Sequence, residues 1–537
     1  MTQPWEIEKF LEVQNGQLHI DRVSTVELAQ QYGTPLFVFS ESRIRHNIVR
    51  IKKAEKSIGC PLKICYAAKA NSNMAILRTV KDAGSDIEVN SGGELWKALK
   101  IGFKPEQIIF NGTSKEVWEI EGAVNAGIYA IQVDSLYELS LIEETAGRLN
   151  KRANVSLRLV PEIETNTHSG LQTALLTSKF GMMPDEAFSA FRDFKDSPHL
   201  DLCGIHLHIG SQNPDSLVYT EALTLLFDFM LRIYRETGNK LKHINLGGGF
   251  PVNYSRGKHR PPDHIQKRID EMVSEGVIRT EHRGQVTTRP VPKEILENYV
   301  RENMFEADYE PREAISHAWE AVRAKAVHLE TVDIMDGLSL LIEPGRSIIA
   351  DAGICLTTVR NLKNRPLKEI NKELNKKVQI ENAKQSRNMG IGFGISHIEG
   401  GFVNKSIDQE NWLLTDAGFN ILLSMETYKW YYHLISAERP GEAHDFPYKL
   451  AGPLCDGGDV YFDIEGSGRL PDHRLLPENV QPGEVLALLN CGAYSLAQAS
   501  QYNGRFLPAV ILIRENGEIV LARKRDTNED LVANEIF

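Results

Sequence analysis

The sequence predicts an α/β protein, with a (β/α)8 barrel followed by a C-terminal β-rich domain. Up to about residue 350, eight short apolar runs alternate with helical patterns, as in a sheet of parallel strands buried on both faces. Beyond that point strand-like runs dominate. The 537 residues also exceed the ~250 that one barrel usually needs, which leaves room for a second domain.

The expected barrel strands lie in runs that each end in polar or glycine residues. They are 62–70, 85–91, 107–112, 128–135, 154–160, 202–211, 242–250 and 338–346. Helical patterns such as 92–102, 135–149 and 216–238 separate most of them. An open doubly wound sheet is the alternative for the same alternation.

The domain organisation follows from these runs. Residues 1–40 are expected to join the β domain, 41–350 to form the barrel, and 351–537 to form the β domain. In the β domain, the runs 354–362, 411–418, 459–466, 484–495, 509–517 and 518–525 are expected to form antiparallel strands. Two stretches are expected to be insertions: the charged, mostly helical pattern of 252–335, and 362–400, which ends in glycine-rich sequence. Surface elaboration is the preferred interpretation, and a lid or an oligomer contact is the alternative.

Composition and charge exclude several classes of protein. The net charge of −11 disfavours a general nucleic-acid binder, which normally presents a basic face. No run approaches the ~20 apolar residues that cross a bilayer, and no secretory signal is expected. The six cysteines lack the paired spacing of a metal site, so no metal is expected and a reducing cytoplasm is the simplest location.

Reactive side chains of such barrels gather at the C-terminal ends of the strands. The polar residues found there are Lys69, Glu88, Arg158, His208, Ser211, Gly247, Gly248, Gly249, Glu343 and Arg346. Lys69 ends an apolar strand, where desolvation is expected to lower its pKa and suit it to Schiff-base chemistry. A lysine that only extends from the barrel rim to solvent is the alternative.

Three further signals are modest when taken singly. A glycine triplet after a strand brings backbone N–H groups close to a phosphate, although tight turns also use glycine. Glu343 and Arg346 place a carboxylate and a guanidinium at another strand end, which suits an anionic ligand or an ordinary ion pair. His208 could stack on a flat ring or be a buried core histidine.

Six motifs in order resemble the fold type III pyridoxal-phosphate decarboxylases, with diaminopimelate decarboxylases most similar and ornithine and arginine decarboxylases as further relatives. The motifs are YAAKAN (66–71), HLHIGSQ (206–212), LGGGFPV (246–252), EPGR (343–346), GPLCDGGD (452–459) and GAYSLAQASQYNGR (492–505). The resemblance runs from about residue 30 to about 525. It implies an alanine-racemase-like barrel, pyridoxal 5'-phosphate as cofactor, and α-decarboxylation of an amino acid, such as meso-diaminopimelate to L-lysine.

The resemblance also implies roles for individual residues. Lys69 would hold the cofactor covalently, Glu343 would face its pyridine nitrogen, and His208 would stack on its ring. The phosphate would be surrounded by Ser211, Gly248, Gly249, Gly345, Arg346 and Tyr494. Arg158 would support His208, and Glu88 occupies a position where relatives carry an acid near the ring.

The remaining carry-over concerns the substrate and the subunits. Cys455 would return a proton to Cα and would come from the partner subunit, so the resemblance implies a homodimer with shared active sites. Substrate binding is assigned to Arg346, Asp416, Asp456 and Tyr494.

The sequence departs from the diaminopimelate decarboxylase pattern at two points. Asp456 stands where a glutamate usually follows the catalytic cysteine, and the Arg-Pro-x-Leu-Tyr segment expected after the Asp-x-Gly turn is missing. Lys429 or Arg505 are candidates to replace that arginine. The substrate therefore stays open between diaminopimelate and another diamino or modified amino acid of a specialised pathway. An amino-acid racemase and a non-catalytic cofactor-binding regulator are the less favoured alternatives.

Overall fold

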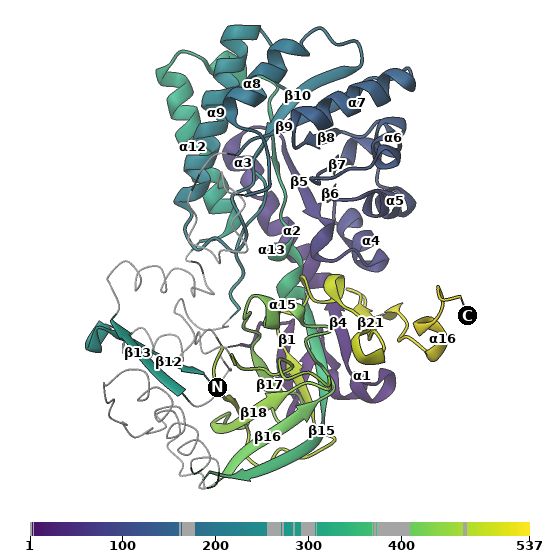
Figure 1. Cartoon of the computed structure of the whole chain (residues 1–537), viewed down its shortest axis with the longest axis vertical. Helices are drawn as coiled ribbons and strands as arrows, with labels where there is room; N and C mark the ends of the chain where they lie inside the picture. The colour runs from purple at the N-terminus through teal and green to yellow at the C-terminus, as the bar shows by residue number, and fades with distance from the viewer. Residues whose placement is uncertain are drawn as a thin grey trace, which may run out of the picture.

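The computed structural model describes residues 3, 5–160, 163, 178–254, 270, 273–282, 285–290, 307, 309–367, 369, 372, 409–464 and 470–536. Eight parallel strands close into a barrel, which forms the upper half of the molecule in Figure 1. They are β5 (Leu62–Ala67), β6 (Asp86–Val89), β7 (Ile108–Phe110), β8 (Ala130–Val133), β9 (Ala153–Arg158), β10 (Leu200–His206), β11 (His243–Asn245) and β14 (Ser339–Ile342). Each strand overlaps one of the predicted runs, although β9 begins one residue and β10 two residues before its run. The closed barrel is confirmed and the open sheet is excluded.

Helices surround the barrel because each strand is followed by an amphipathic segment. These are α4 (Met74–Asp82), α5 (Gly92–Ile101), α6 (Val117–Ala126), α7 (Leu136–Arg148), α8 (Pro184–Asp193), α9 (Leu217–Thr237) and α12 (Pro311–His328), with α2 (Glu41–Lys52) and α3 (Ala54–Ile58) preceding β5. Side-chain caps begin several of them; Ser91, for example, accepts a hydrogen bond from the N–H of Glu94 at the start of α5. Since a helix starts where a strand ends, these caps lie near the C-terminal rim of the barrel.

The second domain is a nine-stranded sheet in the lower half of Figure 1. Its path is β19 (Arg474–Leu476), β18 (Phe446–Ala451), β16 (Gln409–Thr415), β15 (Gly353–Pro366), β4 (Leu36–Ser40), β21 (Ala509–Ile513) and β22 (Ile519–Arg523), with β17 (Leu434–Ser436) and β20 (Val485–Leu488) attached through β15. Most pairs are antiparallel, but β4 runs parallel to β21 and β16 parallel to β18. The sheet is therefore mixed, and the expectation of a purely antiparallel domain is corrected.

The N-terminal region joins this domain. Strand β4 pairs with β15 on one side and β21 on the other, which inserts residues 36–40 into the centre of the β-domain sheet. The preceding strands β1 (Leu11–Gln14), β2 (Gln17–Ile20) and β3 (Val23–Ser24) form a separate small sheet, followed by α1 (Thr25–Tyr32). This small sheet and α1 bury apolar side chains, including Trp5 and Leu11, against the same face of the domain.

The stretches expected to be insertions are shorter than predicted. Helix α12 packs against α9 and α3, so residues 311–328 belong to the regular outer layer of the barrel. Within the first stretch, β12 (Val277–His282) pairs antiparallel with β13 (Gln285–Pro290). Residues 362–366 are part of β15 and pair with β16, whereas most of 367–400 lies outside the described residues.

Two further comparisons concern the sequence predictions. The run 459–466 does not form a strand in its described part, where Val460 makes only an isolated bridge with Ala451. This run contains two buried aspartates, Asp459 and Asp463, which do not fit the side-chain pattern of a strand.

Among the described residues, no helix combines the length and apolar character that a membrane span requires.

Candidate functional site

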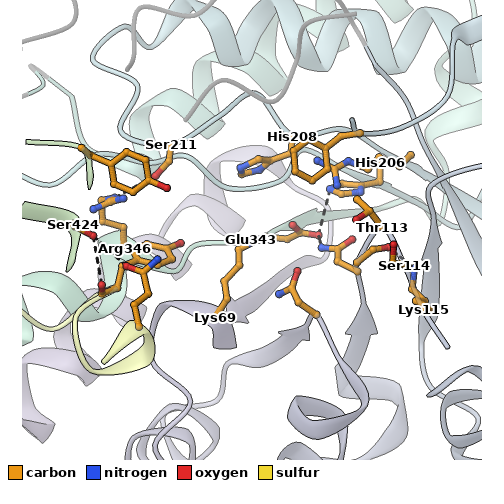
Figure 2. Close-up of a pocket in the computed structure, with 18 of the residues that line it drawn as sticks. Lys69, Thr113, Ser114, Lys115, His206, His208, Ser211, Glu343, Arg346 and Ser424 are labelled. Carbon is orange, nitrogen blue, oxygen red and sulfur yellow. Dashed lines mark hydrogen bonds and ion pairs between the residues drawn. The ribbon is translucent and has the colours of Figure 1, made fainter. Parts of the chain in front are cut away.

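A cavity of about 470 Å³ lies between the C-terminal ends of the barrel strands and the β domain. From the barrel it is lined by Lys69, Asn90, Asn111, Gly112, Thr113, Ser114, Lys115, Arg158, Phe180, His206, His208, Ser211, Glu343 and Arg346. From the β domain it is lined by Ser424, Tyr428, Trp430, Tyr494 and Gln498. In Figure 2, Lys69 lies between Arg346 and Ser424 on one side and Thr113, Ser114 and Lys115 on the other.

Lys69 is the lysine that the end of β5 presents to this cavity. Its side chain is 41% exposed, and its Nζ lies 4.0 Å from Oε1 of the fully buried Glu88. Burial acts to lower the pKa of Lys69, but the Glu88 carboxylate, followed by Tyr494 and Glu343, outweighs that effect and raises it. The expectation that desolvation lowers the pKa of Lys69 is therefore corrected: the surrounding negative charge decides the direction.

Glu343 provides an ionised carboxylate at the base of the cavity. Its Oε1 accepts hydrogen bonds from Asn245 (2.7 Å) and Asn111 (3.0 Å) and lies 3.4 Å from Nε2 of His206. Burial acts to raise the pKa of Glu343, but His206 and Lys69 lower it well below its usual range. A buried, charged acceptor of this kind can hold a protonated ring nitrogen.

His208 provides a neutral aromatic ring. Burial, with Lys69 and Arg158 nearby, lowers its pKa well below the usual value. The N–H of Gly248 donates to Nδ1 of His208 over 3.1 Å, which fixes the orientation of the ring beside the glycine turn. Arg158 pairs with Asp134 at 3.6 Å and stacks on Phe180.

The glycines of this rim pack so closely against neighbouring residues that a side chain would not fit. A Cβ on Gly248 would approach the carbonyl oxygen of Glu343 to 2.3 Å, and one on Gly249 would approach that of Gly210 to 2.3 Å. Gly249 also has a φ of +91°, which L side chains rarely adopt. The Cβ of a residue at position 345 would lie 3.0 Å from that of Ala70. Glycine is therefore required at these positions for the strand ends of the barrel to pack together.

A cation stands beside these glycines. Nε of Arg346 donates to Ser211 over 3.2 Å and Nη1 donates to Tyr254 over 2.8 Å. The guanidinium lies 4.4 Å from the centre of the Trp430 ring and 4.8 Å from that of Tyr494. Tyr254 and Tyr494 help to raise the pKa of Arg346 although its burial acts to lower it.

These residues fit pyridoxal 5'-phosphate. The glycine rim, Ser211 and Arg346 form one anion-binding end, and the charged, buried Glu343 supplies the acceptor that a pyridinium nitrogen requires. Lys69 offers the amine between them. The structure thus brings together six of the predicted residues as lining of one cavity: Lys69, His208, Ser211, Glu343, Arg346 and Tyr494. Gly248, Gly249 and Gly345 lie at the same strand ends but are not among its lining residues.

Cys455 and Asp456 are not among the described residues that line this cavity. Cys455 is exposed, and its N–H donates to Asn503 over 2.7 Å. Asp456 accepts hydrogen bonds from the N–H of Gly458 (2.9 Å) and the hydroxyl of Tyr502 (3.2 Å). The loop thus holds both side chains at the surface of the β domain, apart from the cavity of their own chain.

Asp416, which was expected to bind substrate, has a structural environment and is not among the described residues that line the cavity. Its Oδ1 accepts from Thr357 (2.8 Å) and the N–H of Thr358 (3.0 Å), and its Oδ2 accepts from Thr34 (2.6 Å) and from both Nε and Nη2 of Arg360. These bonds connect β15 to the chain before β4 and occupy both oxygens. The Asp-x-Gly turn therefore joins strands and does not contact the cavity.

The segment after that turn contributes residues that sequence reasoning missed. Ser424, on α15 (Leu423–Thr427), and Tyr428 and Trp430 after it line the cavity. The two cations proposed as replacements are placed elsewhere: Lys429 pairs with Glu426 at 3.1 Å, and Arg505 donates to the carbonyl oxygen of Pro453. No local pattern distinguishes Ser424 from its neighbours, because its role arises only from how α15 docks on the barrel.

Other missed residues had a detectable signal. Asn111 and the following Gly112–Lys115 come directly after β7, and His206 ends β10. The rule that strand ends carry the reactive groups selects all of them. Asn111 in particular matters, because its Nδ2 donates to Glu88 (2.7 Å) and Glu343 (3.0 Å) at once.

Comparison with known proteins agrees with this geometry. Residues 44–288 match the family model described as pyridoxal-dependent decarboxylase, pyridoxal binding domain. The chain is 29% identical to a diaminopimelate decarboxylase of Methanocaldococcus jannaschii over 98% of this chain and 96% of that protein. It is 30% identical to that of Methanothermobacter thermautotrophicus over 96% of this chain and 95% of that protein.

Solved structures give the same result. A crystal structure of the M. jannaschii diaminopimelate decarboxylase, also solved in co-complex with L-lysine, matches with a TM-score of 0.73 and 28% identity over 98% of both chains. The similarity covers both the barrel and the β domain. It agrees with a cavity whose residues fit the cofactor. The chain belongs to the pyridoxal-5'-phosphate-dependent decarboxylases, which are carboxy-lyases.

Proposed function

We propose that this protein removes the α-carboxyl group of an amino acid as CO2, with meso-diaminopimelate, which yields L-lysine, as the first substrate. One observation carries the proposal: Lys69, Glu343 and Arg346 line the same cavity with the charges that the cofactor needs. The choice of substrate is supported by the names of the full-length relatives.

When bound, pyridoxal 5'-phosphate supplies an electron sink for the pair left at Cα as CO2 departs. In this proposal the amine of Lys69 would hold the cofactor. Glu343 keeps a proton on the facing ring nitrogen. Ser211, Gly248, Gly249, Gly345, Arg346 and Tyr494 bind the phosphate, and the neutral His208 covers the ring without adding charge.

The donor of the final proton comes from a second copy of the chain in this proposal. Cys455 is exposed on its own chain and lies outside its own cavity, and Asp456 beside it is turned outward. We therefore assign Cys455 to the protonation of Cα, and Asp456 to the distal end of the substrate, in the partner subunit of a homodimer. The four other cysteines that are buried support a reducing cytoplasm as the location.

A second candidate substrate class has its own observation. Ser424, which is small and neutral, lines the cavity in the segment where the family pattern carries an arginine. Its hydroxyl lies 3.3 Å from Oε1 of Gln498, so two neutral groups meet at this wall. A diamino or modified amino acid without a free distal carboxylate fits such a wall better than diaminopimelate does.

The test is release of CO2 from a panel of amino acids, with chiral analysis of the products. We expect one substrate to turn over with loss of CO2, whereas interconversion of enantiomers without CO2 would indicate a racemase. Reduction with borohydride followed by mass spectrometry should place the cofactor on Lys69. Cofactor binding without any turnover would favour the regulator, and no adduct on Lys69 would reject the proposal.

The shared site has a separate test. Lys69→Ala and Cys455→Ala should each be inactive, but mixing and reassociating them should restore activity to about one quarter of the wild type, because half of the dimers then contain one intact site. Cys60→Ala serves as the matched control, since Cys60 is a half-buried cysteine far from the motif. Failure of the mixture to regain activity would contradict a site built from two chains.

A further inference from the structure

A second buried carboxyl group faces the reacting lysine. Glu88, on β6, is completely enclosed, and its Oε1 lies 4.0 Å from Nζ of Lys69. Nδ2 of Asn111 donates to this same oxygen over 2.7 Å, whereas Oε2 of Glu88 has no hydrogen-bond partner among the described residues. Burying a carboxylate with an unpartnered oxygen is costly, and that cost is smaller when a proton removes the charge.

Glu88 and Glu343 share one amide but have different surroundings. Asn111 donates to both, yet Glu343 also accepts from Asn245 and lies beside His206. Burial, together with the charge of Glu343, raises the pKa of Glu88 to about 7, although Lys69 opposes this. Two neighbouring carboxyls whose environments separate their affinities for a proton form an acid–base arrangement. Glu343 stays charged, and Glu88 is the one that can exchange a proton.

We infer that Glu88 is the proton partner of Lys69. The transfer is balanced: the N–H bond of the Lys69 ammonium breaks, its electron pair stays on nitrogen as the free amine, and the proton forms an O–H bond on Glu88. The reverse transfer restores the ammonium when the lysine is displaced. This inference rests on the proposed function in one respect, namely that Lys69 is the amine that reacts.

Other charged or titratable groups face this pair, but none replaces Glu88. They are Glu94, Arg158, His206, His208, Glu343 and Tyr494. Among the carboxylates that the structure describes, Glu88 alone comes within ion-pair distance of Lys69. Oε2 of Glu94 instead accepts the N–H of Asn90 over 2.8 Å near the start of α5. Glu94 is therefore a matched control, because it faces Lys69 without contacting it.

The first measurement is the pH dependence of Lys69 labelling in the full-length, cofactor-free protein. Trace acetic anhydride and peptide mass spectrometry report the midpoint at which the amine becomes free. Loss of a carboxylate at this distance should lower that midpoint by about one pH unit or more in Glu88→Gln, and by much less in Glu94→Gln. An unchanged midpoint in Glu88→Gln, or an equal change in both variants, would overturn the inference.

The second measurement is the rate of cofactor uptake, followed by visible absorbance between pH 6 and 9. In the wild type the rate should rise through an inflection near pH 7, where Glu88 becomes able to accept a proton. That inflection should vanish in Glu88→Gln and return, displaced, in Glu88→Asp, which keeps the carboxyl group but shortens its reach. A Glu88→Gln profile that keeps the inflection would contradict the role.

The two proposals fail separately. A shifted Lys69 midpoint in a protein that decarboxylates no amino acid would support the proton partnership and reject the proposed function. Decarboxylation of an amino acid by a protein whose Lys69 midpoint does not shift in Glu88→Gln would support the proposed function and reject the proton partnership. If Glu88→Gln does not fold, Glu88→Asp takes its place in both measurements, and profiles that superimpose on those of the wild type would overturn the inference.

Discussion

The two walls of the cavity differ in origin and in how closely they keep to the family. The barrel wall holds Lys69, His208, Glu343 and Arg346, each at the end of a strand and each inside a motif of the family. The β-domain wall holds Ser424 on a short helix, where the expected arginine is missing. From this difference we expect the barrel wall to supply most of the groups that hold the cofactor, and the segment around Ser424, which can change independently, to affect the choice of substrate.

The largest expected effect removes the central group of the barrel wall. Lys69→Ala should lower decarboxylation by more than about a thousandfold, because no other amine replaces it in the reaction. Steady-state CO2 release and retention of cofactor after gel filtration measure this. Lys63→Ala is the control: Lys63 lies on the same strand but pairs with Asp86 outside the cavity. A comparable loss of decarboxylation in Lys69→Ala and Lys63→Ala would contradict a special role for Lys69.

A smaller effect is expected from the charge at the base of the cavity. Glu343→Gln keeps the size of the side chain but loses the negative charge, and should reduce kcat by about a hundredfold. Glu343→Asp, which retains the negative charge, should show a smaller reduction of kcat than Glu343→Gln. Kinetics and the visible spectrum of the bound cofactor report the change, and near-normal turnover in Glu343→Gln would show that the carboxylate does not control the ring nitrogen.

The β-domain wall should respond in selectivity rather than in total activity. Ser424→Arg adds a cation where the family pattern has one, so it should raise the ratio of kcat/KM for meso-diaminopimelate over that for L-lysine by about tenfold. Thr427→Arg is the control, since it adds the same charge at an exposed position of α15. An unchanged ratio in Ser424→Arg would place distal recognition elsewhere.

The last prediction concerns folding stability rather than activity, and it depends on Glu88. Its pKa is raised from 4.5 to about 7 on folding, so the native state favours the protonated form. The stabilisation is complete below pH 4.5 and is lost as pH rises through about 7. Between pH 5 and 8 the free energy of unfolding of the cofactor-free wild type should fall by about 2–3 kcal/mol more than that of Glu88→Gln. Urea unfolding at each pH measures this, and parallel curves would refute it.

Much of the barrel half could be predicted because its signals are local. An apolar run such as Ile64–Ala68 can be satisfied only as a strand buried on both faces, and the polar residue that ends it must then lie at the rim. The same logic would also have selected Asn111 and His206. It could not give the direction of the pKa shift of Lys69, which depends on carboxylates from β6 and β14.

The β-domain half was less predictable because its contacts are distant in sequence. Asp416 resembled a site residue in a turn motif, yet Thr34, far away along the chain, shares its carboxylate. The aspartates of 459–463 interrupted a pattern that otherwise favoured a strand.

By itself, the sequence predicted the barrel, since hydrophobic periodicity and the residue types at strand ends are properties of short segments. Its motifs, which are also short segments, resemble a known family, and that resemblance implied the cofactor and the role proposed for Lys69. The tertiary structure alone decided which groups meet: Glu88 with Lys69, Ser424 with Gln498, and Cys455 away from its own cavity. The physical reason is that electrostatic and hydrogen-bonded partners are selected by distance in space, which chain closure and domain docking set.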